Sequence, residues 1–408
     1  MKRNKNFLPA FLLLGILILS ACIPMIAQSD ATLEQPAVAT IRVETPAIIE
    51  EETGFSSPQP AATGWELELV AQGLEIPWST IFPAENRILV SERTGAIRQV
   101  VDGVLTPDPI FVFEEVRARD EAGLMSLTLH PAYAENASLY ACYTTSGNGS
   151  SMITRVARLI DEGDTLQFER VIIDNIPAAR YHAGCRIQFG PDGMLYVSTG
   201  DALNTDLPQD ITSLAGKILR VTPDGKIPAD NPLPDSPVYS LGHRNPQGLA
   251  WDVVNGNMYS SEHGPSGFDG PGGGDEINLI VPGGNYGWPL GSHDNVPQGT
   301  NGPLIQFTPA EAPASLLFYD DDRLPFFKGN LFFGALRGEG LVRLIISENG
   351  NGEVEIEQVE KIVDNVGRVR DVAAGPDGSI YFVTSNRDGR GALQDGDDKI
   401  FRIYPTYE

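Results

Sequence analysis

Basic residues are scarce in this sequence of 408 residues. Lysine and arginine together number 29, against 54 aspartates and glutamates, and the formal net charge at pH 7 is −25. A surface this acidic repels the phosphates of nucleic acids and the head groups of anionic lipids. We therefore expect no nucleic acid as a partner.

Cysteine and long apolar runs are also rare. The chain has three cysteines, of which Cys142 and Cys185 could pair outside the cytoplasm. Sequence alone does not place their Cα atoms within bonding distance, so the pairing stays open. The one long apolar run, residues 7–19, is too short for a comfortable membrane span.

The first 63 residues are interpreted as targeting and tether. Lys2, Arg3 and Lys5 precede the apolar run, and "LSAC", which ends at Cys22, follows it. The pattern resembles a bacterial lipobox and predicts a lipoprotein signal peptide over residues 1–21, with an ordinary secretory signal or an uncleaved anchor as the alternatives. Residues 22–63 hold the lipid-bearing cysteine and then a disordered linker rich in Ala, Pro, Thr, Glu and Ser. We expect an extracytoplasmic lipoprotein anchored to a bacterial membrane, with residues 64–408 as its folded domain.

That domain contains six loosely similar repeats of one sequence unit. They lie near residues 81, 129, 189, 251, 326 and 374, and each has an apolar residue, a turn of Pro, Asp, Asn or Gly, and a β-rich strand. Their spacing of about 50 to 75 residues suits a four-stranded antiparallel sheet with variable loops. The sequence predicts an all-β, six-bladed β-propeller, and an all-β sandwich is the alternative.

Four arginines lie next to these repeats in the sequence. They are Arg244, Arg337, Arg368 and Arg370, the first within "GHRNPQG" together with Asn245 and Gln247. Since the loops of all propeller blades converge on one face, these guanidinium groups could form a pocket for a small molecule with several carboxylates. The alternative is that each arginine pairs with a nearby acid, as Arg370 could with Asp371.

One histidine is a candidate general base. His182 precedes a predicted strand that is followed by a turn and a second strand, and Asp201 closes the second strand. A histidine with a pKa near neutrality can take a proton from a hydroxyl, and an aspartate would fix its tautomer. A histidine held only by backbone groups is the alternative, and His130 and His293 are interpreted in that way. The glycine-rich stretch 261–289 would suit a hard cation such as calcium.

These motifs together resemble the glucose/sorbosone dehydrogenase family, which includes soluble quinoprotein glucose dehydrogenase and aldose sugar dehydrogenases. The resemblance runs from about Trp65 to Ile403 and is carried by "GLMSLTLHP", "HAGCRIQFGPDGMLYVSTGD", "SLAGKILRVTPDG", "LGHRNPQGLAWD", "EHGP", "GDEINLIVPGGNYGWP" and "GRVRDVAAGPDGSIYFVTS". It implies a six-bladed propeller that binds pyrroloquinoline quinone (PQQ) and calcium.

The resemblance also assigns roles to residues. It implies His182 as the general base, Asp201 as its support and Arg244 at the quinone. It implies cofactor contacts for Glu121, Arg244, Asn245, Gln247, Arg337, Arg368 and Arg370, and calcium contacts for the carbonyls of Gly264 and Pro265. The chain departs from the family pattern at three of its positions: Glu121 replaces a glutamine, Cys185 a glycine and Arg337 a lysine.

The function that follows is oxidation of the C1 hydroxyl of an aldose sugar to a lactone, with electrons passing to an unidentified acceptor. A non-catalytic propeller that binds a sugar or a protein is the alternative. A metal-dependent lactonase would need axial carboxylates, and the arginines argue against it. The sequence does not determine which sugar is used or the oligomeric state.

Overall fold

The computed structural model describes residues 62–149, 151–350 and 352–407. The signal peptide, Cys22 and nearly all of the tether lie outside these residues. Two short helical turns are present, α1 (Tyr133–Asn136) and η1 (Asn386–Asp388). In the described part of the chain, no helix is long and apolar enough to cross a membrane.

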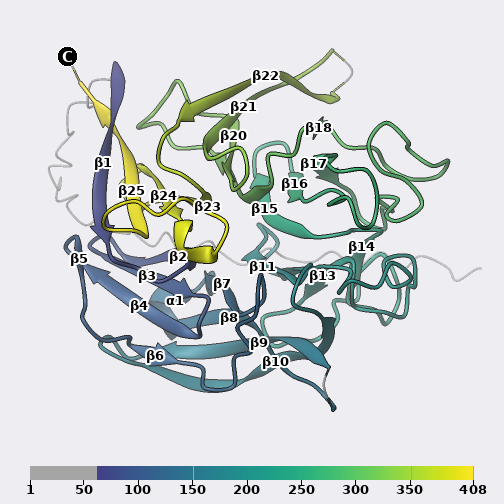
Figure 1. Cartoon of the computed structure of the whole chain (residues 1–408), viewed down its shortest axis with the longest axis horizontal. Helices are drawn as coiled ribbons and strands as arrows, with labels where there is room; N and C mark the ends of the chain where they lie inside the picture. Colours follow the sequence, from purple (N-terminus) through teal and green to yellow (C-terminus); the bar gives the residue numbers. More distant parts are fainter. Residues whose placement is uncertain (1–61, 150, 351, 408) are drawn as a thin grey trace, which may run out of the picture. The chain divides into compact units, whose positions relative to one another are not determined.

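Six antiparallel sheets form the blades of a β-propeller, as the sequence predicts (Figure 1). Blades 1 to 3 contain β2 (Pro77–Ala84), β3 (Arg87–Glu92), β4 (Ala96–Val101), β5 (Val104–Leu105) and β6 (Phe111–Val112); β7 (Leu124–Leu129), β8 (Ser138–Ser146), β9 (Met152–Asp161) and β10 (Leu166–Ala178); and β11 (Gly184–Phe189), β12 (Leu195–Thr199), β13 (Lys217–Val221) and β14 (Val238–Leu241). Blades 4 to 6 contain β15 (Pro246–Asp252), β16 (Asn257–Glu262), β17 (Asp275–Ile280) and β18 (Ile305–Phe307); β19 (Pro313–Tyr319), β20 (Asn330–Ala335), β21 (Gly340–Glu348) and β22 (Val354–Val363); and β23 (Val369–Ala374), β24 (Ile380–Thr384), β25 (Lys399–Thr406) and β1 (Gly64–Gln72).

Each repeat in the sequence contains the turn between the first and second strands of one blade. The turn at residues 190–194, for example, joins β11 to β12, and the turn at residues 375–379 joins β23 to β24. A local turn signal followed by an apolar strand is repeated once per sheet, and this is why the blade count could be read from the sequence.

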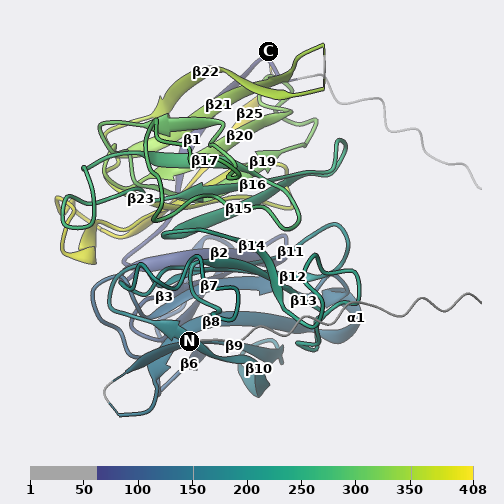
Figure 2. The same cartoon turned by 90° about the vertical axis from the view of Figure 1, so that its right-hand side faces the viewer.

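The first strands of the blades form a closed ring around the axis. β2 contacts β7 and β23, and the other contacts run from β7 to β11, β15, β19 and β23 in turn. In the side view of Figure 2, β15 of blade 4 lies beside β11 of blade 3. Blade 6 is completed by β1 from the start of the domain, which pairs with β25 from its end (Figure 1). The loops that leave the ring on one face therefore come from all six blades.

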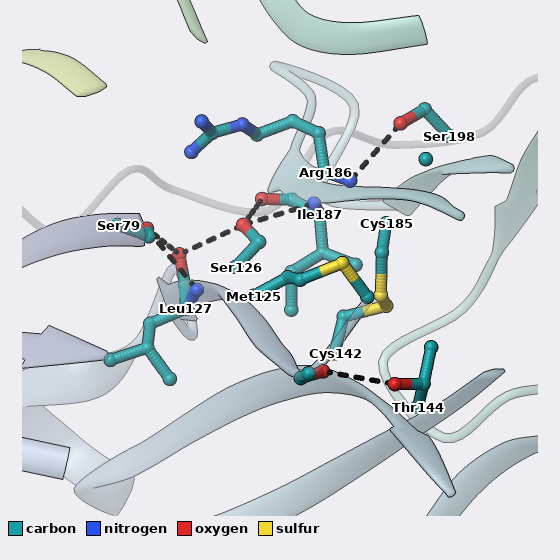
Figure 3. Close-up of a disulfide and its surroundings, with 12 residues drawn as sticks. Ser79, Met125, Ser126, Leu127, Cys142, Thr144, Cys185, Arg186, Ile187 and Ser198 are labelled. Carbon is teal, nitrogen blue, oxygen red and sulfur yellow. Dashed lines mark hydrogen bonds between the residues drawn. A yellow bond between two sulfur atoms is a disulfide. The ribbon is translucent and has the colours of Figure 1, made fainter. Parts of the chain in front are cut away.

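The core lies between neighbouring blades. One cluster between blades 2 and 3 contains Met125, Cys142, Cys185 and Ile187, all buried. Cys142 on β8 and Cys185 on β11 form a disulfide with a Cα–Cα distance of 5.8 Å. Figure 3 shows this bridge beside Met125 and Ile187. The pairing left open by the sequence is therefore present, and it ties blade 2 to the strand that follows His182.

Candidate active site

His182 sits where two chain segments come unusually close. It lies just before β11 with a φ of 53°, in the left-handed region. A Cβ on Gly200, just after β12, would lie 2.0 Å from the carbonyl oxygen of His182. Only glycine fits there, because any side chain would displace the histidine backbone. Gly200 therefore brings the end of β12 against His182.

Asp201 follows Gly200 and faces the imidazole. Its Oδ1 lies 2.8 Å from Nδ1 of His182, and both residues are buried. Its Oδ2 accepts a hydrogen bond of 2.9 Å from Nε1 of Trp288, and its Oδ1 also accepts one of 2.8 Å from the backbone N–H of Leu203. A carboxylate can only accept, so Nδ1 of the imidazole carries a proton, and in the neutral form of this tautomer Nε2 holds the lone pair. No hydrogen bond within the described residues involves Nε2 of His182.

A cavity of about 360 Å³ is lined by Glu121, which accepts a hydrogen bond from the backbone N–H of His182, whereas neither His182 nor Asp201 is among the lining residues. Four arginines line it: Arg337, Arg368, Arg370 and Arg390. Arg337 is exposed, whereas Arg368 and Arg370 are buried. The predicted convergence of Arg337, Arg368 and Arg370 is therefore seen in space, and Arg390 from the loop before β25 joins them.

The two buried arginines differ in how they are neutralised. Arg368 is paired with Asp388, with Nε–Oδ2 at 2.9 Å and Nη2–Oδ2 at 2.8 Å. Arg370 donates from Nη1 to Oε1 of Gln247 at 3.0 Å, and its buried Nε has no partner. The local pairing of Arg370 with Asp371 is absent, because Asp371 pairs with Arg186 at 3.0 Å. Burial lowers the pKa of Arg370 to about 10, with Asp388 opposing this shift and Arg368 adding to it.

Arg244 lies behind the cavity wall, not on it. Its guanidinium donates from Nε to Asp269 at 2.8 Å, from Nη1 to the carbonyl of His263 at 3.0 Å and from Nη2 to Ser266 at 3.1 Å. The guanidinium also lies over the ring of Trp288 at 5.5 Å. His263 and Ser266 do line the cavity. Arg244 therefore holds the loop that forms this wall.

Asn245 and Gln247 hold residues of the site in place through hydrogen bonds. Oδ1 of Asn245 accepts hydrogen bonds from the backbone N–H of Gly184 at 3.2 Å and from Nε2 of Gln247 at 3.0 Å. Both side chains are buried. Gln247 holds Arg370, and Asn245 holds the chain next to His182. Neither residue is among those that line the cavity.

Gly264 and Pro265 lie in the cavity wall among backbone carbonyls. A Cβ on Gly264 would lie 2.3 Å from the carbonyl oxygens of both Gly273 and Gly274. The N–H of Gly264 donates to Asp275 at 2.8 Å, and the carbonyl of Pro265 accepts from Gly273 at 3.2 Å. In the described ranges, no three side chains of His, Cys, Asp or Glu are grouped to hold a metal. A cation here would depend on carbonyl oxygens.

The sequence reasoning missed two residues of the loop after β16. Nε2 of His263 is buried without a partner, and burial lowers the pKa of His263 to about 4, so the imidazole is neutral. Phe268 is 68% exposed, and its ring stacks on that of His182 at 5.9 Å. His263 could have been found, since it stands in the quoted motif "EHGP". Phe268 has no local signal.

The cavity thus has several guanidinium groups in its wall and is linked through Glu121 to the backbone of His182, whose imidazole is oriented by Asp201. Arg370 Nε and His263 Nε2 are polar atoms without partners in its wall. Buried polar atoms in native proteins are usually satisfied, so these two indicate a ligand with hydrogen-bonding groups of its own. A compact anion with carboxylates fits the arginines.

Comparison with known proteins identifies the family of the chain. The family described as Glucose / Sorbosone dehydrogenase matches residues 74–394. An aldose sugar dehydrogenase of Escherichia coli is 30% identical over 346 residues, covering 79% of this chain and 91% of that protein.

Two solved structures are similar throughout the propeller. A putative oxidoreductase (glucose dehydrogenase) of Thermus thermophilus is 42% identical with a TM-score of 0.77, covering 83% of this chain and 100% of that one. The PQQ-bound aldose sugar dehydrogenase of Streptomyces coelicolor is 35% identical with a TM-score of 0.72, covering 85% of this chain and 99% of that one. With the family match spanning most of the sequence, the chain belongs to the glucose/sorbosone dehydrogenase family.

Proposed function

We propose that this protein oxidises the C1 hydroxyl of an aldose sugar to the lactone, using PQQ and calcium. The observation that carries the proposal is the cavity lined by Arg368 and Arg370, whose wall is linked through Glu121 to the backbone of His182. The family and the PQQ-bound relative support the same chemistry. When bound, PQQ supplies a quinone that accepts the hydride leaving C1 of the sugar.

The cavity wall fits a tricarboxylate such as PQQ. Arg337, Arg368 and Arg370 offer guanidinium groups to its carboxylates, and charge-assisted pairs of this kind are about twice as strong as neutral ones. The unpartnered Nε of Arg370 and Nε2 of His263 would be satisfied by its oxygen or nitrogen atoms. Arg244 would act by holding the loop that carries His263 and, as the family resemblance implies, at the quinone.

His182 is proposed to take the proton of the C1 hydroxyl at Nε2. Asp201 holds Nδ1–H, so the imidazole presents its lone pair in one orientation and the positive ring that forms is stabilised. Trp288 fixes the other carboxylate oxygen and so fixes Asp201. A positioned general base typically contributes about 10²–10⁴ in rate.

Calcium, the acceptor and the anchor complete the proposal. The carbonyls of Gly264 and Pro265 would hold the ion together with oxygens of the cofactor, because calcium takes six to eight oxygen ligands. The electrons would pass on to an acceptor outside the cytoplasm. Lipid attachment at Cys22 would keep the domain at a membrane.

The test is reconstitution of the purified chain with PQQ and Ca²⁺, followed by dye reduction across a panel of aldoses. Wild type should turn over at least one aldose and lose turnover when EDTA removes the calcium. His182→Ala should bind PQQ with unchanged affinity but lose about 10²–10⁴ in kcat.

His130→Ala is the matched control, because His130 lies at the turn of blade 2, stacked on Tyr140. It should keep wild-type turnover. PQQ bound without turnover of any aldose would favour a binding protein. Near-normal turnover by His182→Ala would refute the role of the imidazole.

A further inference from the structure

Glu121 is an acidic side chain in the cavity wall that contacts the backbone of His182. Glu121 precedes β7, and its Oε2 accepts hydrogen bonds from the backbone N–H of His182 at 3.3 Å and from Nδ2 of Asn245 at 3.4 Å. Its Oε1 lies 3.1 Å from Nη1 of Arg390. Glu121 and Arg390 both line the cavity.

Glu121 is ionised at any working pH. Burial by itself would raise the pKa of Glu121, but neighbouring positive groups, of which Arg390 and Arg370 stay charged where the imidazoles are neutral, outweigh burial and lower the pKa. An ionised carboxylate in the wall repels an anionic ligand unless a cation stays beside it. Glu121 therefore adds a negative charge to the wall, which must be offset if the cavity is to attract an anion.

Arg390 is placed to offset that charge. It belongs to the loop between η1 and β25 in blade 6, 269 residues away from Glu121 in the sequence. Asp388, the last residue of η1, accepts from the backbone N–H of Arg390 at 2.9 Å and pairs with Arg368. The guanidinium of Arg390 also lies over the ring of Tyr181, 5.4 Å from its centroid. Its side chain is 52% exposed, so it could have remained in solvent had nothing held it.

The Glu121–Arg390 pair also contacts the backbone of His182. Glu121 is held by Arg390 through one oxygen and holds the backbone of His182 through the other. The contact thus joins loops from blades 6, 2 and 3 at the mouth of the cavity.

We propose that Arg390 is a positioning residue for the cofactor. It neutralises Glu121, which keeps the cavity attractive to a carboxylate-bearing ligand and keeps Glu121 aligned on His182. This inference rests on the proposed function, because the ligand it concerns is PQQ.

The test is the affinity of the full chain for PQQ with Ca²⁺ present, measured by calorimetry in the absence of sugar. Arg390→Ala should weaken binding by about tenfold or more, because Glu121 is left as an unpaired charge in the wall. Glu121→Gln should bind at least as tightly as wild type. The double variant should return to within about twofold of Glu121→Gln, since it has no charge left to offset.

Arg180→Ala is the matched control. Arg180 also lies over the ring of Tyr181, at 5.0 Å, but it pairs with Asp120 and does not line the cavity. It should bind PQQ like wild type. Unchanged affinity in Arg390→Ala, or a double variant as weak as Arg390→Ala, would overturn the inference while leaving the proposed function intact. Failure of wild type to bind PQQ would refute the proposed function and, with it, this role of Arg390.

Discussion

Removing the disulfide between Cys142 and Cys185 should measurably destabilise the propeller. The bridge closes a loop over a sequence separation of 43 residues, and the loop-entropy relation for this length gives about 13 cal/mol/K. At 25 °C this loss of entropy raises the free energy of the unfolded chain by about 4 kcal/mol. Cys142→Ala/Cys185→Ala should lower the free energy of unfolding by about that amount.

The expected change in melting temperature follows from the size of the domain. An unfolding entropy of about 2.1 cal/mol/K per residue over roughly 345 described residues gives about 0.7 kcal/mol/K. A loss of about 4 kcal/mol then lowers Tm by about 5 °C. Differential scanning calorimetry of wild type and the double variant measures this difference.

Reductant provides the control. When wild type is heated in the presence of dithiothreitol, its Tm should equal that of the variant, because the unfolded chain is then no longer crosslinked. Peptide mapping of alkylated wild type shows separately whether the bridge forms. If the bridge is intact and the two Tm values agree within about 1 °C, the reasoning from loop entropy is wrong. If both thiols are alkylated in the folded protein, the pairing itself is refuted.

Two further predictions concern the site and its surroundings. Trp288→Phe removes the N–H that holds Oδ2 of Asp201 and should lower kcat by about tenfold at unchanged PQQ affinity, and an unaltered kcat in steady-state assays would show that Asp201 needs no such support. The pKa of Glu276 is raised to about 8, by burial first and then by Glu262, so between pH 5 and 8 this carboxyl binds more protons in the folded chain than in the unfolded chain and its contribution to the free energy of unfolding falls as the pH rises. Glu276→Gln should flatten that fall in urea titrations at pH 5 and pH 8, and an equally steep fall in the variant would assign it to other groups.

Much of the site could be predicted because its residues follow local motifs. Asp201 lies at the end of the strand after His182, and the two are 19 residues apart within one blade, so a short hairpin brings them together. Arg368 and Arg370 flank the first residue of an inner strand, and both line the cavity. Arg244 shows the limit of such reasoning. Its motif predicted that Arg244 belongs to the site, but it did not predict the ion pair with Asp269.

By itself, the sequence determined the all-β class and the count of six blades, because turns and apolar strands are written locally and repeat once per blade. Only the tertiary structure decided which distant side chains meet: Cys142 with Cys185, Trp288 with Asp201, and Arg390 with Glu121. Those pairings depend on how far each blade is rotated about the axis and on the paths of the loops between strands. Neither property has a short-range signature, because both arise from packing between blades that are far apart in the chain.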